Sequence, residues 1–225
     1  MTTMLPVDVT CAICGTTSTH MVVASTSTFG APDLDTRPPP LMRSTIANRI
    51  QRCPECGYCA PELSHSNIGR EALQRTDYAH QLADPTISEL ANSYLCWARL
   101  CEGRSDHSSA GWAALQAAWV CDDDDRTERS RDCRHRAALS FQRAWELGDS
   151  FAPNAASEHC IVIDVWRRAG RFAEARQVLD ASAKLQLDDL FVRILSLERL
   201  LIQAEDDRCH TVDEALNPSD TDHTS

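Results

Sequence analysis

Two short cysteine motifs constrain this chain more than any other feature. They are Cys11-Ala-Ile-Cys14-Gly15 and Cys53-Pro-Glu-Cys56-Gly57. The two-residue spacing lets both sulfurs of one turn reach the same ion, and the glycine that follows permits a sharp bend behind it. Four thiolates are enough to complete a tetrahedral zinc site. The sequence therefore predicts one structural Zn²⁺ bound by Cys11, Cys14, Cys53 and Cys56, although iron uses the same four thiolates and is an open alternative.

The remaining cysteines and the nearby histidines have simpler interpretations. Cys59 follows Cys56 by three residues, and packing behind the second turn is favoured over a ligand or redox role. The later cysteines fall in predicted helices or near their ends and are interpreted as small buried hydrophobic residues: Cys96, Cys101, Cys121, Cys133, Cys160 and Cys209. His20 and His65 lie nearest to the motifs. Because four cysteines already complete the site, neither histidine is needed as a ligand.

Composition and charge narrow the class of protein. A chain of 225 residues with 43% hydrophobic content can form one large domain or two small ones around an ordinary core. Its net charge of −11 opposes general attraction to nucleic-acid phosphates. No run approaches the roughly 18 apolar residues of a membrane span, and the N-terminus lacks a signal-peptide pattern. We therefore expect a cytoplasmic protein whose reduced thiols favour metal binding over disulfides.

The N-terminal part of the chain has the character of a small β module. Residues 7–28 are rich in Val and Thr and alternate loosely, which predicts two short antiparallel strands joined by the first cysteine turn. Residues 44–53 are predicted to form a strand that leads into the second turn. The sequence thus predicts a zinc-ribbon-like module over residues 1–65.

A proline-rich insert, residues 29–43, separates the two cysteine motifs. Its prolines favour an extended chain and withhold backbone donors. Asp33, Asp35 and Arg37 are spaced by two residues, so an extended chain directs all three side chains to one side. One interpretation is a small polar binding surface beside the metal. The favoured alternative is that Asp35 and Arg37 fix the loop through an ion pair or bonds to backbone amides.

Helical patterns replace strand patterns from about residue 66 onward. Residues 66–82 show helical spacing, and Asp84-Pro85 is predicted to start a second helix with proline at its first position. That helix is expected to end near Gly103. Residues 107–121 then carry an apolar stripe typical of another packed helix.

The run Asp122–Asp125 is the one true charge run in the chain. It lacks the spaced ligands and the glycine of a calcium loop. Asp125 and Glu128 have the spacing of a capping box, and acidic residues near a helix start complement the helix dipole. A solvated loop followed by a capped helix is therefore favoured over a cation site.

Residues 161–179 resemble a tetratricopeptide repeat, in which two helices pair around a short turn. Trp166 and Ala175 are nine residues apart, as the repeat pattern expects. An upstream unit over 112–144 aligns in the same way, with nine extra residues assigned to its turn, and 188–204 is predicted to be a closing helix. We expect a tetratricopeptide-like helical domain over 66–206, with plain helical packing as the alternative. The acidic tail, residues 207–225, is expected to be disordered.

Several stretches of the chain form a joint pattern. They are the two cysteine motifs, the insert from Phe29 to Pro40, Ala-Ala-Trp-Val-Cys-Asp-Asp at 117–123 and Arg-Arg-Ala-Gly-Arg-Phe-Ala-Glu-Ala at 167–175. Together they resemble a bacterial family filed as domain of unknown function 2225, over most of residues 8–205. The resemblance implies a zinc-ribbon-like N-terminus followed by tetratricopeptide-like helices, and it implies no activity.

The predicted fold class is α+β, mostly α, and the predicted function is a non-enzymatic scaffold. A closed site with four cysteines leaves no open position for water or substrate, while a helical-repeat surface suits a protein partner. Nucleic-acid binding is the first alternative, with candidate contacts Arg43, Arg49, Arg52, Arg70 and the stacking residue Tyr58. Thiol-redox or iron chemistry is the second. The sequence has no catalytic triad, paired-carboxylate or phosphate-loop pattern.

Overall fold

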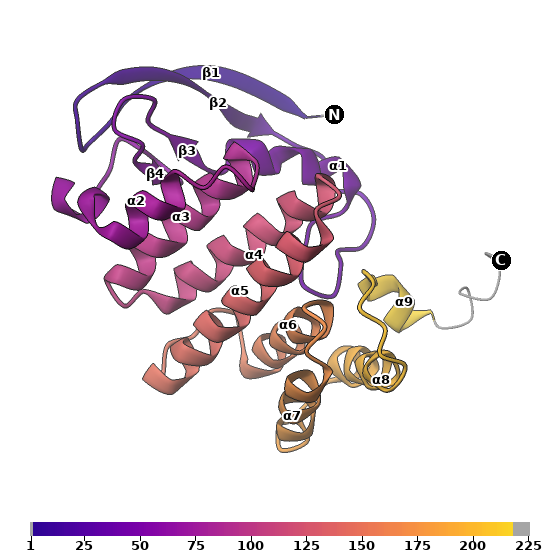
Figure 1. The fold of residues 1–225 in the computed structure, drawn as a ribbon. Helices are drawn as coiled ribbons and strands as arrows, with labels where there is room; N and C mark the ends of the chain where they lie inside the picture. The colour runs from indigo at the N-terminus through magenta and orange to yellow at the C-terminus, as the bar shows by residue number, and fades with distance from the viewer. Residues whose placement is uncertain (1, 218–225) are drawn as a thin grey trace.

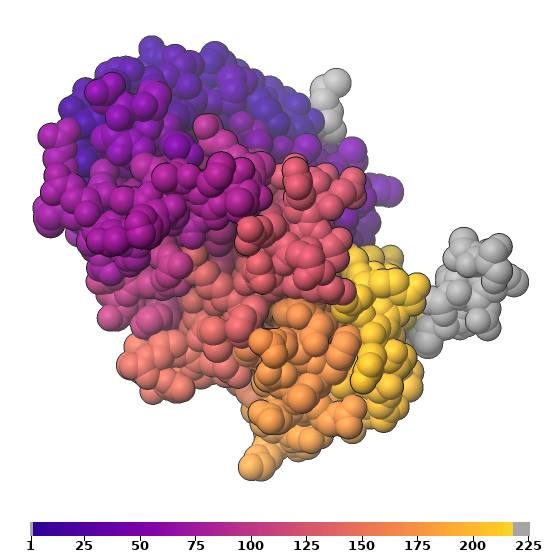
Figure 2. Space-filling model, in the orientation of Figure 1, coloured from indigo at the N-terminus to yellow at the C-terminus, as the bar shows by residue number. Residues whose placement is uncertain are grey.

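The protein is described here by a computed structural model that places residues 2–217. Two β-hairpins and short helices form the N-terminal part, and the remainder of the described chain is helical (Figure 1). β1 and β2 lie across one end of the molecule and α7 lies at the other (Figure 1). Figure 2 shows the same order on the surface, from the indigo N-terminal residues to the orange and yellow C-terminal helices. The expected α+β, mostly α class is confirmed.

The elements have the following bounds. The strands are β1 Thr3–Thr10, β2 Thr17–Ser25, β3 Gln51–Arg52 and β4 Cys59–Ala60. The short helices before the helical part are α1 Pro40–Arg43, η1 Ser44–Asn48, η2 Arg70–Gln74 and α2 Thr76–Leu82. The later helices are α3 Glu89–Gly103, α4 His107–Asp123, α5 Thr127–Leu147, α6 Ala155–Arg168, α7 Phe172–Ser182, α8 Asp189–Gln203 and α9 Val212–Leu216.

Each cysteine turn connects the two strands of a hairpin. β1 pairs antiparallel with β2, and Thr10 lies opposite Thr17 at the end next to the first turn. This confirms the two strands predicted around that turn. β3 pairs antiparallel with β4, with Arg52 opposite Cys59 across the second turn. Both motifs therefore lie at hairpin ends, where the chain reverses.

The strand predicted over residues 44–53 is wrong for most of its length. Only Gln51 and Arg52 are in a strand, and residues 44–48 form η1 instead. Pro40 opens a helical turn because its fixed φ suits the first helical position. The Thr45 hydroxyl then donates to the carbonyl of Met42 at 2.7 Å, which favours continued helical turns over an extended chain.

The helix expected to start at Asp84-Pro85 begins later. One oxygen of the Asp84 carboxylate accepts both the backbone N–H and the hydroxyl of Thr86, at 2.9 and 2.6 Å. These bonds close a turn of the kind that Asp favours, and the turn delays the helix. α3 follows Ser88, whose backbone is extended, and ends at Gly103 as expected.

α4 is the central helix of the larger core. It packs between α3 and α5, and Figure 1 shows it between those two helices. Its alanine-rich sequence lets both neighbours approach closely. The buried residues on α4 are Ala110, Gly111, Ala113, Ala114, Leu115, Ala117, Ala118, Trp119, Val120 and Cys121.

The turn between α4 and α5 differs from the prediction. α4 continues through Asp123, α5 begins at Thr127, and Asp125 has a left-handed φ of 55°. The predicted capping box at Asp125 is therefore not formed, and no side chain caps the start of α5. The nine residues assigned to a long turn instead lengthen the two helices.

α6 and α7 form the helical hairpin that the repeat-like segment predicts. The Asn154 side chain caps α6 by accepting from the backbone N–H of Ser157 at 2.9 Å. Gly170, with φ of 71°, makes the turn between the helices. Trp166 and Ala175 are both buried, and α8 covers the pair at the position predicted for a closing helix.

The sequence predicted disorder from residue 207 onward. The described chain instead continues after α8 into an ordered segment. Thr211 and Glu214 form a capping box at the start of α9. The backbone N–H of Leu34 donates to the carbonyl of His210 at 2.9 Å, and that of Val212 donates to Pro32 at 3.0 Å. These contacts tie residues 210–212 to the insert. Residues 218–225 lie outside the described residues.

Two hydrophobic clusters fill the interior. The larger joins α3 to α8 and includes Leu34 from the insert. The smaller surrounds the cysteine turns, and it combines Cys11, Cys53 and Tyr58 with Tyr78 of α2 and Leu100 of α3. The β module and the first helices therefore share one core.

The close approach of α4 and α5 gives a stability prediction. A Cβ on Gly111 would lie 2.5 Å from the ring of Phe141. Because that ring is fully buried and has little room to move, Gly111→Ala should lower the free energy of unfolding by about 1–3 kcal/mol. Ser108→Ala on the same helix is the control and should change it by less than about 0.5 kcal/mol in the same denaturant titration. Equal stability of the two variants would show that α5 moves away without strain.

Candidate metal centre

The two cysteine motifs fold into the same hydrogen-bonded turn. In each turn the glycine N–H donates to the carbonyl of the first cysteine, at 2.9 Å in the first and 3.0 Å in the second. The N–H of that cysteine donates across the turn to a carbonyl, that of Thr16 at 2.9 Å in the first turn and that of Tyr58 at 2.8 Å in the second. Gly15 and Gly57 have φ values of 79° and 71°, a region that side chains with a Cβ rarely adopt. Local chemistry thus specifies both turns.

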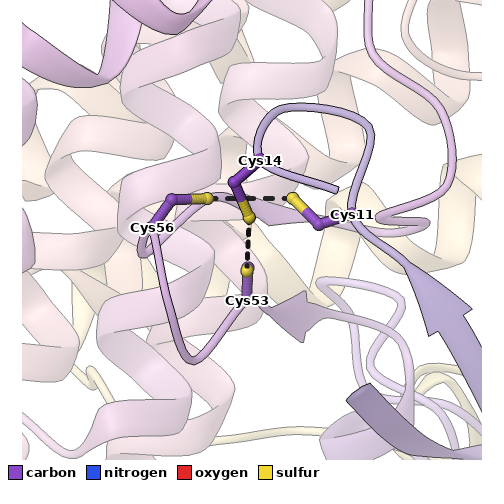
Figure 3. Close-up of side chains that lie close together, drawn as sticks. All are labelled: Cys11, Cys14, Cys53 and Cys56. Atoms are coloured by element: carbon purple, nitrogen blue, oxygen red, sulfur yellow. Dashed lines mark hydrogen bonds between the residues drawn. The ribbon is translucent and has the colours of Figure 1, made fainter. Parts of the chain in front are cut away.

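The structure brings the four predicted cysteines together (Figure 3). Their sulfur atoms all lie within 4.8 Å of one another. The Cys11 and Cys56 sulfurs are 3.7 Å apart and those of Cys14 and Cys53 are 3.5 Å apart, so each close pair joins one turn to the other. A disulfide needs about 2.05 Å. A tetrahedral ion with bonds of about 2.3 Å to sulfur needs sulfur–sulfur edges of about 3.8 Å, which these distances match.

The environment of the thiols favours a bound cation. Hydrogen bonds from the side chain and backbone of Thr16 lower the pKa of the Cys14 thiol to about 6. Burial raises the pKa of Cys53 and of Cys56, because a dry site resists negative charge. Four thiolates are compatible with this site only when a cation balances their charge, and a bound metal supplies it. The donor set and its geometry therefore fit one thiophilic metal ion.

The other candidate ligands lie outside the cluster. Cys59 is fully buried, its thiol donates to the carbonyl of Gly57 at 3.4 Å, and it packs in the smaller core. His20 bonds to the hydroxyl of Ser18 at 2.9 Å. His65 is exposed beside Glu62. The packing role favoured for Cys59 agrees with these contacts.

Tyr58 does not offer the stacking surface considered for nucleic-acid binding. Its side chain is 1% exposed, and its hydroxyl donates to the carbonyl of His65 at 3.1 Å. Arg43 is also engaged, since it bonds to Asp33 and, at 2.7 Å, to the carbonyl of Pro38. The nearby basic residues therefore lack the aromatic platform that single-strand binding uses.

The insert is a closed turn, whereas the sequence predicted an extended chain. Thr36 has a φ of 67°, and its N–H donates to the carbonyl of Asp33 at 2.9 Å. Asp33, Asp35 and Arg37 are each 5% exposed or less. Their side chains contact different partners within the chain, so the structure does not bring the three together as one exposed surface.

Asp35 is the centre of a buried ion-pair network. Its carboxylate accepts from Arg168 at 2.9 Å, from Arg134 at 3.4 Å and from the Trp119 indole at 2.9 Å. It also accepts the backbone N–H of Arg37 at 3.1 Å. Burial opposes ionisation of Asp35, but the two guanidinium groups outweigh it and lower the pKa of this carboxyl. The contact to Arg37 is the backbone bond that the alternative interpretation of the loop anticipated.

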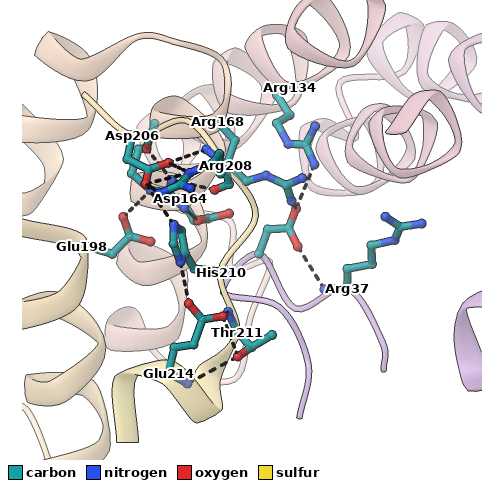
Figure 4. A network of polar contacts seen from close by, with 12 residues as sticks. Arg37, Arg134, Asp164, Arg168, Glu198, Asp206, Arg208, His210, Thr211 and Glu214 are labelled. Atoms are coloured by element: carbon teal, nitrogen blue, oxygen red, sulfur yellow. Dashed lines mark hydrogen bonds and ion pairs between the residues drawn. The ribbon is translucent and has the colours of Figure 1, made fainter. Parts of the chain in front are cut away.

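Asp122 completes the network from α4. It accepts from Arg134 at 2.6 Å and from Arg168 at 2.9 Å, and it also bonds to Ser130 (Figure 4 shows Arg134 and Arg168). Burial opposes its ionisation, but Arg134 and Arg168 lower its pKa to about 2. The interpretation of Asp122 as part of a solvated loop is therefore wrong.

Sequence reasoning did not assign roles to Arg134 and Arg168. One signal was present for Arg168, which follows a buried apolar run on α6 and has Arg167 beside it. Two adjacent arginines that extend an apolar helix face rarely stay in the interior without paired carboxylates. No comparable local signal marks Arg134, because α5 carries arginines on several faces.

Comparisons with family models, with curated proteins and with solved structures find no match to this chain. Among residues 2–217, no helix is long and apolar enough to cross a membrane.

Cys14→Ser tests the metal centre. Mutation of a residue that only hydrogen-bonds to a metal ligand weakens metal affinity by about 10–100-fold. Removal of a thiolate ligand itself should weaken the affinity by more than that. We expect the purified variant to lack the metal that elemental analysis finds in the unchanged protein. Cys59→Ser removes a thiol outside the cluster and should keep its metal. Loss of metal from both variants would contradict the four-cysteine assignment.

Asp35→Ala tests the ion-pair network. It leaves Arg134 and Arg168 buried with one carboxylate fewer, and we expect a loss of about 3 kcal/mol in the free energy of unfolding. Asp123→Ala is the matched control, because Asp123 lies 2.5 Å from Arg37 but is half exposed. It should cost less than about 1 kcal/mol in the same denaturant titration. Equal losses would mean that burial does not strengthen the Asp35 contacts.

Proposed function

We propose that this protein is a scaffold in which one structural Zn²⁺ holds the N-terminal module and the helical surface binds a protein partner. The observation that carries the proposal is the cluster of four sulfur atoms at tetrahedral spacing. A site with four protein ligands has no open position, so its role is to hold the fold. The paired arrangement of α6 and α7 supports the second half of the proposal.

The position of the metal centre supports a structural role. Cys11 and Cys53 are 1% exposed or less and pack with Leu63 and Tyr78 in the smaller core. An ion there would fix two hairpins and, through the shared core, α2 and α3. Hydrolytic zinc sites instead keep one coordination position for water. A scaffold role therefore fits this burial better than catalysis.

The finer assignments are part of the same proposal. A hairpin at each cysteine turn supports a zinc-ribbon-like module, and the α6–α7 pair supports tetratricopeptide-like hairpins. Membership of the bacterial family of domain of unknown function 2225 rests on the motifs quoted above. A site built from reduced thiols suits the cytoplasm, where disulfides are rare.

The face between α3 and α5 is the candidate partner surface. A hollow of about 410 Å³ there is lined by Arg99, Arg136 and Arg143 among others, and a second of about 190 Å³ shares Arg99 and Arg136. Leu139 lines the larger hollow and is 50% exposed. Arginine is enriched in protein interfaces, and the exposed Leu139 adds an apolar contact beside the arginines.

Leu139→Glu tests this surface. A carboxylate in place of Leu139 should abolish an apolar contact there, because charged groups are depleted from interface cores. We expect affinity capture from the native cell, read by quantitative mass spectrometry, to lose its main partner with this variant. Leu200→Glu on α8 is the matched control, since Leu200 is 62% exposed and lies away from the hollow. A partner retained by L139E and lost with L200E would place binding on α8.

A further inference from the structure

The segment that follows α8 covers the insert. Residues 204–217, here called the C-terminal strap, include α9 and pair with the insert through Leu34 and Val212, as described above. Arg167 of α6 holds the strap from the interior. Its Nη1 donates to the carbonyl of Asp206 at 2.6 Å and to that of Arg208 at 2.9 Å. A single guanidinium therefore fixes the first turn of the strap.

The same guanidinium faces two carboxyl groups. Its Nε donates to Glu198 of α8 at 2.9 Å, and its Nη2 bonds to Asp164 of α6. Arg167 and Glu198 are fully buried and Asp164 is 1% exposed. If both carboxyl groups were ionised, this dry site would contain two negative charges and one positive charge. Such an imbalance is strongly unfavourable away from water.

Each carboxyl group has one oxygen that no donor reaches. These atoms are Asp164 Oδ2 and Glu198 Oε1, and both are buried. Both carboxyl groups contact the same guanidinium, Glu198 at Nε and Asp164 at Nη2 of Arg167, so the two are held close together around it. Two carboxylates have only acceptors, so they form a hydrogen bond only when one of them carries a proton. One bound proton would satisfy both orphan oxygens and balance the charge at the same time.

We propose that Asp164 and Glu198 form a proton-binding site that holds one proton at neutral pH, and that this proton keeps the C-terminal strap closed. With the proton bound, the net charge of the pair and Arg167 is zero. Arg167 is then free to direct Nη1 to the two strap carbonyls. Loss of the proton leaves an unbalanced buried charge, which is relieved when the strap opens and admits water.

The surrounding charged and titratable groups support Glu198 as the proton carrier. Burial and the neighbouring Asp164 raise the pKa of Glu198 well above its usual value. Arg168 is also within electrostatic reach of Asp164, and Arg168 is itself paired with Asp35 and Asp122. Cys160 is also near the pair, and burial raises its pKa to about 12, so it stays neutral.

The strap carries its own titratable groups on the other side of Arg167. His210 contacts Asp206 and Glu214 at 3.4 and 2.6 Å, and Asp206 also pairs with Arg208 (Figure 4). Within residues 2–217, the side chains of these strap residues make no contact with the Asp164–Glu198 pair. Imidazole side chains are the ones that most often change charge near neutral pH, so an experiment must separate the contribution of His210 from that of the pair.

The linkage has a definite sign. A carboxyl whose pKa is higher in the folded state than its usual 4.5 binds a proton on folding. Stability therefore falls as pH rises between the usual value and the folded value. One extra bound proton raises the unfolding equilibrium constant about tenfold per pH unit in that interval.

Glu198→Gln tests the proposal, because the amide keeps the shape and donates an N–H to Asp164 at every pH. We expect the ratio of unfolding constants, unchanged protein over E198Q, to rise about tenfold per pH unit above pH ~6. His210 is present in both proteins, so its contribution cancels in the ratio. Glu158→Gln is the matched control. Glu158 is a buried carboxylate with three N–H donors, and its variant should not show this rise.

Two further readouts make the outcome decisive. Carbon-13 NMR of glutamate carboxyl groups in the unchanged protein should show Glu198 protonated at pH 7. Hydrogen exchange of the Val212 amide should accelerate with pH more in the unchanged protein than in E198Q. A flat ratio, or an ionised Glu198 at pH 7, would overturn the proton site, and the NMR result decides if E198Q does not fold. Equal exchange at Val212 in both proteins would overturn the link to the strap.

Discussion

Four cysteine sulfurs gathered within 4.8 Å form the constraint on which the N-terminal half of this protein depends. Four thiolates repel one another, and only a cation makes their assembly favourable. The two turns that supply them close two hairpins, and those hairpins have too few strands to be stable alone. The core around the turns extends to Tyr78 and Leu100, so α2 and α3 are attached to the same centre. The metal-binding module is thus continuous with the helices.

The insert between the cysteine motifs forms a second connection to the helices. The chain on either side of it leads to the two cysteine turns, and its middle inserts Asp35 between α4, α5 and α6 through Trp119, Arg134 and Arg168. The strap then covers the insert from outside, held by Arg167. Buried ion pairs of this kind add little net stability but are costly to break, which favours one arrangement of the parts over alternatives. Within residues 2–217 the interior therefore contains two polar centres in addition to the four-cysteine cluster.

Features whose determining residues lie close together in the sequence could be predicted from it, and features that depend on residues far apart could not. The cysteine turns and the α6–α7 hairpin were predictable because their determinants, such as Gly57 and Gly170, lie within a few residues of one another. The Asp35 network was not, because Asp35 and Arg168 are 133 positions apart and no local pattern pairs them. The predicted start of a helix was wrong where a side chain closes a turn before it, as Asp84 does before α3. The strap was missed because its polar composition resembles a disordered tail, whereas Arg167 and the insert bind its backbone.

X-ray absorption spectroscopy at the metal edge tests the central claim most directly, since it identifies the element and its ligands in the intact protein. The account predicts one zinc ion per chain with four sulfur neighbours at about 2.3 Å and no nitrogen or oxygen neighbour. An iron edge with the same four sulfurs would keep the structural centre and correct its metal. A protein that is folded and contains no metal, or a metal with mixed ligands, would contradict the account.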